Sequence, residues 1–374
     1  MGRSIGVDLH RDCFTTAILA ANGRCYTREW KLKDLGKFIE TLSVDDKVAV
    51  EMTTNVRLFY DAVWPYVERV DVVNARQFKV VTESVKKTDK NDAVLLARFL
   101  EKDMLPTVHL KSKPLAELAS LTRTRDTLVK QRTTLKNQVN NLFAASGVKL
   151  RRERMSSNRA LSDVEGEALA ILSVAESLEV KVLLGQIRAI NEGVSELEKK
   201  IAEEAGKQPG YAEVTSIKGI GVNSAAILLS VIGDVRRFEN EGKLASYLGI
   251  VPRVSDSNET EHRGRITKRG SKLARTALVQ CGLVAKKYSP YLADYHERLK
   301  RKKGGGKANI ALARKLLAIV YRTLMNGWVF EDFAAFQLKD GTIPVWSRDG
   351  AVKYAASQRD LSLSTKTGKR KRAT

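Results

Sequence analysis

The first 105 residues alternate between strand-like and helix-like segments, and the order of these segments restricts the fold more than any other feature of the chain. Short apolar runs rich in β-branched residues are typical of strands, whereas apolar residues three and four positions apart are typical of helices. Asn22-Gly23 favours a tight turn between two strands. These patterns predict strands over 4–9, 14–20, 24–30, 47–52 and 70–74, and helices over 32–42, 55–67 and 89–102.

This order, β-β-β-α-β-α-β-α, predicts an α/β domain with a mixed sheet and helices on its faces. It matches the ribonuclease H type of fold, in which the first and fourth strands are neighbours. Asp8 stands near the carboxyl end of the first predicted strand and Glu51 near that of the fourth, so both side chains can reach one point. Asp89 and Asp92 are three residues apart at a helix start, which puts them on one face.

These four carboxylates predict a metal site that cuts nucleic acid. A carboxylate in an apolar strand is costly unless it is paired or binds a metal, and Glu51 lies between Val50 and Met52. Four converging carboxylates repel one another unless cations neutralise them. The three cysteines and four histidines show no ligand spacing, so the metal would sit on oxygen, which suits Mg²⁺ or Mn²⁺. For Asp92 the alternative is a first-turn acid favoured by the helix dipole.

The charge of the chain favours a nucleic-acid partner. Lysine and arginine number 65 against 43 aspartates and glutamates, a formal net charge of +22. An excess of this size attracts polyanions, although a merely basic enzyme is the alternative. No stretch approaches the roughly 20 apolar residues of a membrane helix, and no signal peptide precedes the first strand. We therefore expect a cytoplasmic protein that does not bind membranes.

A leucine repeat marks a change of character after the first domain. Leu121, Leu128, Leu135 and Leu142 recur every seven residues, which predicts a long helix over 113–146, roughly 50 Å long at 1.5 Å per residue. A second helical region over about 163–205 could pair with it within the chain or across a dimer.

The remaining chain predicts a compact helical domain followed by a basic end. Residues 211–335 are mostly helical in pattern, with Gly219-x-Gly221 as a hairpin between two helices. Such a hairpin either presents N–H groups to phosphate or is only a tight turn. The predicted domains are 1–108, a metal-binding α/β domain; 109–206, a long helical coiled-coil linker; 207–337, a mostly α-helical domain; and 338–374, a mobile basic extension.

Four motifs of the first half resemble a known family. Ile5-Gly6-Val7-Asp8, Val50-Glu51, Val73-Asn74-Ala75-Arg76-Gln77 and Lys87-Thr88-Asp89-Lys90-Asn91-Asp92-Ala93 resemble the DEDD domain of IS110-family transposases. The resemblance implies that Asp8, Glu51, Asp89 and Asp92 form a RuvC-like metal site.

The second half resembles the same family. The segments 244–252 and 264–270 are similar to its second, transposase-type domain, which carries a serine between them. Matched by spacing, that serine falls on Ser257, with Ser255 as the alternative and Asn258 in place of the usual glycine. The resemblance implies that Ser257 works with the metal site and attacks DNA, leaving a phosphoserine and a free 3′-hydroxyl. It also implies donor and target DNA, a non-coding guide RNA that pairs with both, and a homodimer or homotetramer.

Basic side chains on the long helix, at the glycine hairpin and after Ser257 are predicted to contact nucleic-acid phosphates, which positions a substrate without reading its sequence. They are Arg123, Arg125, Lys130, Arg132, Lys136, Lys218, Arg263, Arg265, Lys268, Arg269, Lys272 and Arg275, with the backbone of Gly219 and Gly221. For the long helix, a solvated face is the alternative. Two other functions stay open: a junction nuclease that uses water at the same metal site, and a non-catalytic nucleic-acid-binding protein.

Overall fold

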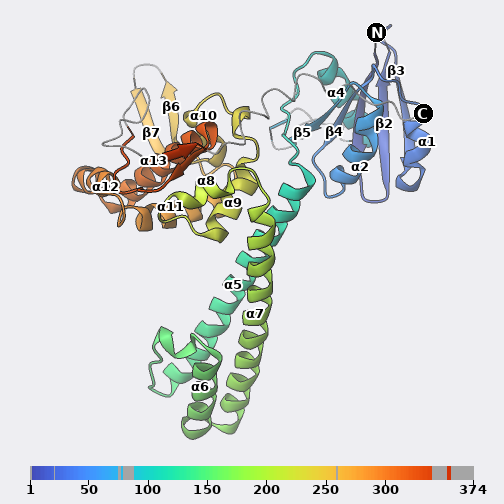
Figure 1. Ribbon diagram of the computed structural model, residues 1–374. Helices are drawn as coiled ribbons and strands as arrows, with labels where there is room; N and C mark the ends of the chain where they lie inside the picture. The colour runs from blue at the N-terminus through green and yellow to red at the C-terminus, as the bar shows by residue number, and fades with distance from the viewer. Residues whose placement is uncertain are drawn as a thin grey trace. The chain divides into compact units, whose positions relative to one another are not determined.

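The computed structural model describes residues 2–20, 22–74, 77–78, 88–257, 260–338 and 352–354, with the backbone alone at 152–153, 254–257, 260–263 and 352–354 (Figure 1). The chain divides into two compact units, Met1–Lys111 and Ser112–Thr374. No helix of the described ranges combines the length and apolar composition that crossing a membrane requires.

A mixed five-stranded sheet organises the first unit, with strand order β3-β2-β1-β4-β5. The central strand β1 pairs antiparallel with β2, β2 pairs antiparallel with β3, and β4 pairs parallel with both β1 and β5. The predicted mixed sheet is therefore confirmed, with bounds within one or two residues of the prediction. The strands are β1 (Ser4–Leu9), β2 (Cys13–Leu19), β3 (Cys25–Lys31), β4 (Lys47–Glu51) and β5 (Arg69–Val73).

Helices cover both faces of this sheet. On one face, α1 (Leu35–Ile39) and α2 (Val56–Val63) contribute Phe38 and Phe59 to a core with the apolar side chains of β1 and β4. On the other face, α4 (Asp89–Glu101) packs alanines and leucines against small residues of the strands. The two faces thus differ, because large aromatic side chains pack on one face and α4 lies close to the strands on the other. Figure 1 shows the sheet with α1, α2 and α4 around it.

Two long helices, α5 (Lys113–Ala145) and α7 (Val174–Gly206), lie side by side in the second unit (Figure 1). The predicted helix over 113–146 is confirmed, and its partner belongs to the same chain. The region predicted as 163–205 is two helices, α6 (Asn158–Ile171) and α7. The break falls at Ser173, whose hydroxyl accepts from the Glu176 N–H while the Glu176 carboxylate accepts from the Ser173 N–H, a capping box.

The face that α5 buries is not a strict heptad seam. Leu118 and Val139 are fully buried, while Leu121, Leu135 and Leu142 are partly buried. A straight helix has 3.6 residues per turn, so its buried face drifts away from a seven-residue repeat along its length. The repeat therefore predicted the helix better than it predicted which side chains are buried.

The rest of the second unit is a helical core, with a hairpin that the sequence pattern did not predict. The hairpin joins two polar strands, β6 (Pro252–Ser257) and β7 (Thr260–Ile266), which lack the apolar alternation of a buried strand. The helices are α8 (Tyr211–Ser216), α9 (Val222–Ile232), α10 (Glu241–Leu248), α11 (Lys272–Ala285), α12 (Pro290–Lys303) and α13 (Gly305–Asn326).

Part of the predicted basic extension over 338–374 is described. Leu338 is buried, and β9 (Val352–Tyr354) pairs antiparallel with β8 (Trp328–Phe330). The remaining residues of the extension, including the basic run 366–372, lie outside the described residues. Its mobility stays a prediction.

Candidate functional site

Strand alternation gives β1 one apolar face and one functional face. Ile5, Val7 and Leu9 belong to the core with α1 and α2, so Gly6 and Asp8 face α4 on the opposite side. A Cβ built at Gly6 would lie 2.0 Å from the Ala93 carbonyl oxygen, so only glycine lets α4 approach this closely. The sequence Ile-Gly-Val-Asp thus packs α4 on β1 and places a carboxylate at the strand's carboxyl end.

Glu51 occupies the equivalent place on the neighbouring strand. Val7 of β1 pairs with Val50 of β4, so Asp8 and Glu51 are the next residues of two adjacent parallel strands. Ala49 packs toward α4, and strand alternation puts Glu51 on that same side, where it is half-buried.

The first turn of α4 supplies the other two predicted acids. Thr88 caps the helix, its hydroxyl accepting from the Asn91 N–H at 3.3 Å. Asp89 is exposed, whereas Asp92 is buried with 6% of its surface exposed. The helix dipole favours acids in a first turn, but a surface acid needs no burial. Burial of Asp92 therefore favours the site interpretation over the helix-dipole one.

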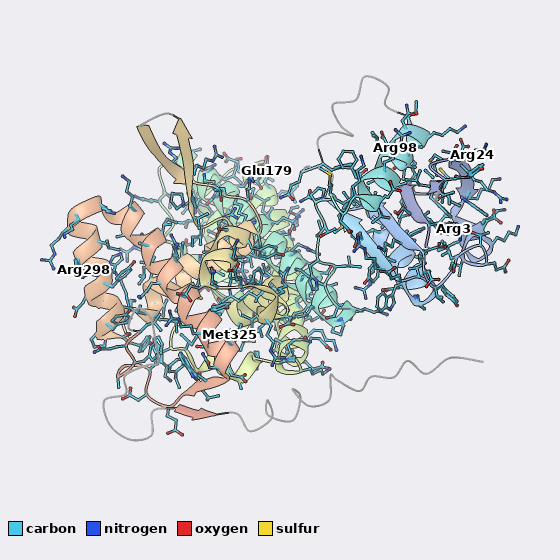
Figure 2. All side chains as sticks on the ribbon, turned by 90° about the horizontal axis from the view of Figure 1, so that it is seen from above. Arg3, Arg24, Arg98, Glu179, Arg298 and Met325 are labelled. Atoms are coloured by element: carbon cyan, nitrogen blue, oxygen red, sulfur yellow. The ribbon has the colours of Figure 1, made fainter. Side chains whose placement is uncertain are left out.

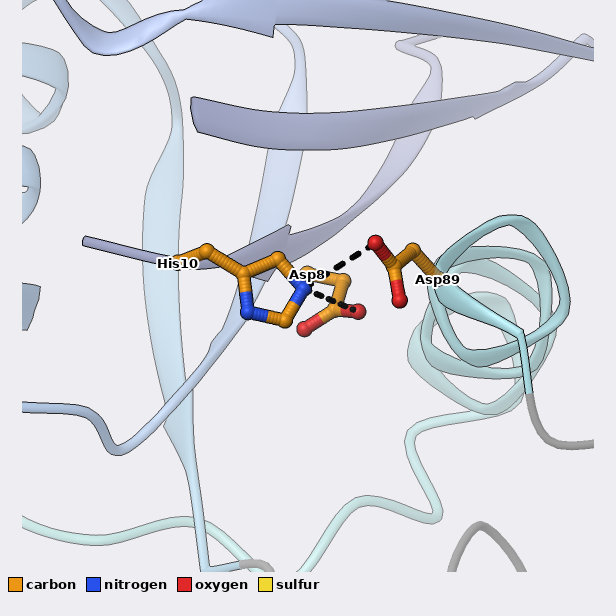
Figure 3. A group of neighbouring side chains, drawn as sticks. All are labelled: Asp8, His10 and Asp89. Atoms are coloured by element: carbon orange, nitrogen blue, oxygen red, sulfur yellow. Dashed lines mark ion pairs between the residues drawn. The ribbon is translucent and has the colours of Figure 1, made fainter. Parts of the chain in front are cut away.

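His10 links Asp8 to Asp89, a contact that the sequence analysis missed (Figure 3). Its Nε2 lies 3.3 Å from Asp8 Oδ2 and 3.2 Å from Asp89 Oδ2. The ligand atoms of these three residues all lie within 4.8 Å of one another, close enough to hold one metal ion. The available signal was His10 two positions after Asp8, the spacing that keeps side chains on one face of an extended chain.

The electrostatics of Asp8 fit a cation site. Burial raises the pKa of the Asp8 carboxyl; His10 opposes this shift, and the negative charges of Asp89 and Asp92 add to it. The anionic form of Asp8 is therefore disfavoured in the protein alone and would gain from a cation nearby. Oxygen-rich carboxylate sets of this kind suit Mg²⁺ or Mn²⁺, with His10 as a possible nitrogen donor.

The predicted serine lies in the second unit. The backbone of Ser257 ends β6 and pairs with Thr260, while Ser255 pairs with His262. The side chains of Ser255, Ser257 and Arg263 lie outside the described residues. The choice between the two serines therefore stays a prediction.

Several predicted DNA-contacting side chains make bonds within the protein. Arg125 donates to Glu198 of α7 at 2.9 and 2.5 Å, and Arg132 donates to Asn191 of the same helix at 2.8 Å. Lys130 pairs with Asp126, and Lys136 donates to the Met155 carbonyl. Arg125, Arg132 and Lys136 thus bond α5 to its surroundings, which favours a structural role for them over the predicted phosphate contact, whereas the Lys130 pair lies within α5 and leaves Lys130 exposed.

Other predicted contacts remain accessible. Lys218 is exposed at the hairpin before α9, as are Arg123 on α5 and Arg265, Lys268, Arg269 and Lys272 near β7. Gly219 has φ +106 and packs on the backbone of Ala285, so the hairpin depends on glycine there. Gly221 caps α9 and is exposed. Arg275 instead donates to the carbonyls of Leu248 and Arg269, at 2.9 and 2.7 Å.

Two family models match the chain. The model for the DEDD domain of IS110 transposases, described as "Transposase", matches residues 5–145. The model described as "Transposase IS116/IS110/IS902 family" matches residues 211–297. The first match contains all four predicted carboxylates, and the second contains Ser257.

Curated proteins similar to this chain carry related descriptions. The transposase for insertion sequence element IS1111A of Coxiella burnetii is 24% identical over 325 residues, 86% of this chain and 89% of that protein. A probable family 20 transposase of Pseudomonas aeruginosa is 26% identical over 243 residues, 64% of this chain and 72% of its own. The pilin gene-inverting protein of Moraxella lacunata is 27% identical over 279 residues, 70% and 74% of the two chains.

Proposed function

The chain belongs to the IS110 family of insertion-element transposases, and on this premise we propose that it cuts and rejoins DNA through a metal site built on Asp8, Glu51, Asp89 and Asp92. The observation that carries the proposal is the meeting of Asp8 and Asp89 at His10, beside the buried Asp92. A relative described as gene-inverting fits a recombinase, because inversion requires rejoining as well as cutting.

A RuvC-like fold is part of this proposal. The strand order β3-β2-β1-β4-β5, with antiparallel pairing on one side of β1 and parallel pairing on the other, supports it. In this arrangement the ends of β1 and β4 and the start of α4 deliver carboxylates from three elements that are distant in sequence.

The proposed metal is Mg²⁺ or Mn²⁺, held by the four carboxylates. When bound, such ions stabilise the attacking and leaving oxygens of a phosphodiester. Asp8 and Glu51 would hold the ion from rigid strand ends, and Asp89 and Asp92 from the first turn of α4. His10, which contacts Asp8 and Asp89, either joins the ligands or orients the two carboxylates.

Ser257 is the proposed nucleophile, on the strength of its motif position. Its hydroxyl oxygen forms a bond to the phosphorus while the bond between phosphorus and the 3′-oxygen breaks. The departing 3′-oxygen gains a proton as the serine loses one, so the products are a phosphoserine and a 3′-hydroxyl. The reverse attack by a 3′-hydroxyl of another strand releases the serine and rejoins DNA.

The partners proposed from the family are donor DNA, target DNA, a non-coding guide RNA and further copies of this chain. The net charge of +22 supports a nucleic-acid partner in general. A DNA substrate also fits the cytoplasmic location that the sequence predicts.

The metal site is tested by recombination of a donor and a target plasmid. Asp8→Ala and Glu51→Ala should each abolish formation of the recombined plasmid. Both variants should still fold, as a cooperative unfolding transition shows. Asp45→Ala removes an exposed acid from the same unit and should recombine normally. Full activity of either site variant would overturn the assignment.

The serine is tested by trapping the covalent intermediate on DNA. A protein–DNA adduct should form with the unaltered chain and with Ser255→Ala, and it should vanish with Ser257→Ala. An adduct that maps to Ser255 would move the nucleophile. Free 5′-phosphates without an adduct would indicate a water-using junction nuclease, and DNA binding without cleavage a non-catalytic protein.

A further inference from the structure

A basic cleft of about 1230 Å³ opens in the second unit between α12, α13 and the base of the β6–β7 hairpin. Among the described residues that line it, seven are basic and one, Glu241, is acidic. Glu241 pairs with Arg322 at 3.1 Å, so its charge is compensated. The cleft therefore has a strongly positive wall, and the basic side chains used below are Arg265, Lys302, Lys303, Lys307 and Lys315.

Apolar side chains also line the basic cleft, and together they are called its floor below. Ile250, Leu299 and Ile310 line it, together with Tyr295. Lys315 Nζ lies 5.7 Å from the centre of the Tyr295 ring, and the guanidinium carbon of Arg298, labelled in Figure 2, lies 5.9 Å from it. Positive charge above an apolar, aromatic floor suits a ligand that carries both phosphate and a flat apolar face, namely an unstacked nucleotide.

This combination favours a single strand over a duplex. A duplex turns its phosphates outward and hides the faces of its bases, so it would leave the apolar floor empty. An unpaired strand can place a base on Tyr295 while its phosphates contact the lysines. Stacking of a base on an aromatic ring contributes about 1–3 kcal/mol and tolerates any base.

The position of the cleft relates it to the predicted nucleophile. Pro252 of β6 and Arg265 of β7 line the cleft, and β6 ends at Ser257. Five residues of extended chain span about 16 Å at ~3.3 Å per residue. A few nucleotides of an unpaired, unstacked strand can cover that distance.

We propose that the basic cleft binds an unpaired stretch of the DNA strand that Ser257 attacks. Its task would be to hold that strand near the hairpin while ends are exchanged. The proposal rests on the proposed function for the identity of the strand, but not for the binding itself. The chain's own end is a poor occupant, because residues 339–374 carry nine basic and three acidic side chains and would be repelled.

The experiment compares two double variants of the full chain that lose the same charge. Lys303→Gln with Lys307→Gln removes two cleft lysines, whereas Lys300→Gln with Arg301→Gln removes two exposed cations of α12 that do not line the cleft. Binding of a fluorescent oligodeoxythymidylate is followed by anisotropy over a range of salt concentrations. The cleft variant should bind at least tenfold more weakly, and its salt slope should fall by about 1.4, or ~0.7 per lost phosphate contact. The control should stay within about twofold of the unaltered chain.

Tyr295 provides a second, uncharged test. Tyr295→Phe should bind as the unaltered chain does, and Tyr295→Leu, which keeps apolar bulk without a ring, should bind about tenfold more weakly.

Two results of these measurements would overturn the proposal: an equal loss of oligonucleotide binding in the cleft double variant and its control, or unchanged binding by Tyr295→Leu. So would tighter binding of the matched duplex, or of single-stranded RNA, by the cleft. An unaltered chain that binds the strand but does not recombine DNA indicates failed recombination chemistry, whereas a cleft variant that binds as well as the unaltered chain indicates a failed cleft, so the two failures give different results.

Discussion

At the scale of single residues, the buried Asp8 carboxyl opposes folding when it is charged. The carboxylate is 7% exposed, and burial together with Asp89 and Asp92 raises its pKa. A raised pKa means that folding favours the protonated acid. The resulting stability is present at low pH and is lost as the pH rises through the pKa of the folded state, so at neutral pH the charge opposes folding.

Replacing Asp8 with asparagine should therefore stabilise the metal-free protein while it abolishes recombination. The amide keeps the size of the side chain and removes the charge that is repelled by Asp89 and Asp92. We expect the free energy of unfolding at neutral pH to rise by about 1 kcal/mol. Substitutions that remove a destabilising functional group commonly have an effect of this size. Urea unfolding in the presence of a chelator measures it.

Addition of Mg²⁺ separates this effect from simple repacking. The ion should stabilise the unaltered chain and have little effect on Asp8→Asn, while Asp45→Asn should behave like the unaltered chain in both conditions. A metal-free Asp8→Asn protein less stable than the unaltered chain would contradict the electrostatic argument.

The contrast between Glu51 and His10 shows what single residues reveal in a sequence. Glu51 stands out as a candidate, because an acid inside an apolar strand is conspicuous in its local context, and its role in the site stays a prediction. His10 carried only a weak local signal, its position two residues after Asp8, because its contact with Asp89 forms only after α4 docks on β1. Contacts that tertiary packing assembles from distant parts of the chain leave little pattern in the sequence.

At the scale of elements, the approach of α4 to β1 sets the geometry of the acidic site. A Cβ at Gly6 would lie 2.0 Å from the Ala93 carbonyl oxygen and 2.5 Å from the Ala97 N. Both atoms are helix backbone, which cannot rotate away as a side chain can. The distance from Asp8 to the first turn of α4 therefore depends on the absence of one carbon atom.

Gly6→Ala should push α4 outward and separate Asp89 and Asp92 from Asp8. Overpacking of this kind costs about 1–3 kcal/mol, and recombination should fall by more than the fraction of unfolded protein explains. Gly36→Ala is the matched control, because a Cβ there meets no atom within 4 Å and α1 should gain up to ~1 kcal/mol from the better helix former. Unfolding midpoints and recombination yields of both variants are the measurement; a fully active, equally stable Gly6→Ala would refute the close-packing argument.

Helices of the second unit illustrate the limit of periodic patterns. The leucine repeat predicted the position and length of α5, but the basic face assigned to nucleic acid contains Arg125 and Arg132, which bond to α7. Periodicity gives the faces of a helix and not the partner of each face. The hairpin β6–β7 escaped prediction for a related reason, since its strands follow no apolar alternation.

At the scale of the molecule, an apolar surface on α6 and α7 is left uncovered in the described chain. Val174, Leu178 and Val182 are four residues apart on α7, which puts them on one face, and Leu169 of α6 is also exposed. Exposed apolar groups in a continuous stripe mark protein contacts more often than isolated ones do. The stripe supports the proposed homodimer or homotetramer, with a second copy as its partner.

Leu178→Glu should consequently weaken self-association. The Leu178 side chain is 62% exposed, so the substitution should cost the folded single chain little. In the assembly it would replace a central apolar contact with a charge, at a cost of about 2 kcal/mol, which raises the dissociation constant about thirtyfold. Light scattering coupled to size-exclusion chromatography, over a dilution series, measures the shift toward monomer. Leu58→Glu places the same charge at a leucine of 55% exposure on α2 and should leave the assembly intact. If both variants assemble like the unaltered chain, the stripe is not the interface; if both dissociate, charge rather than position explains the effect.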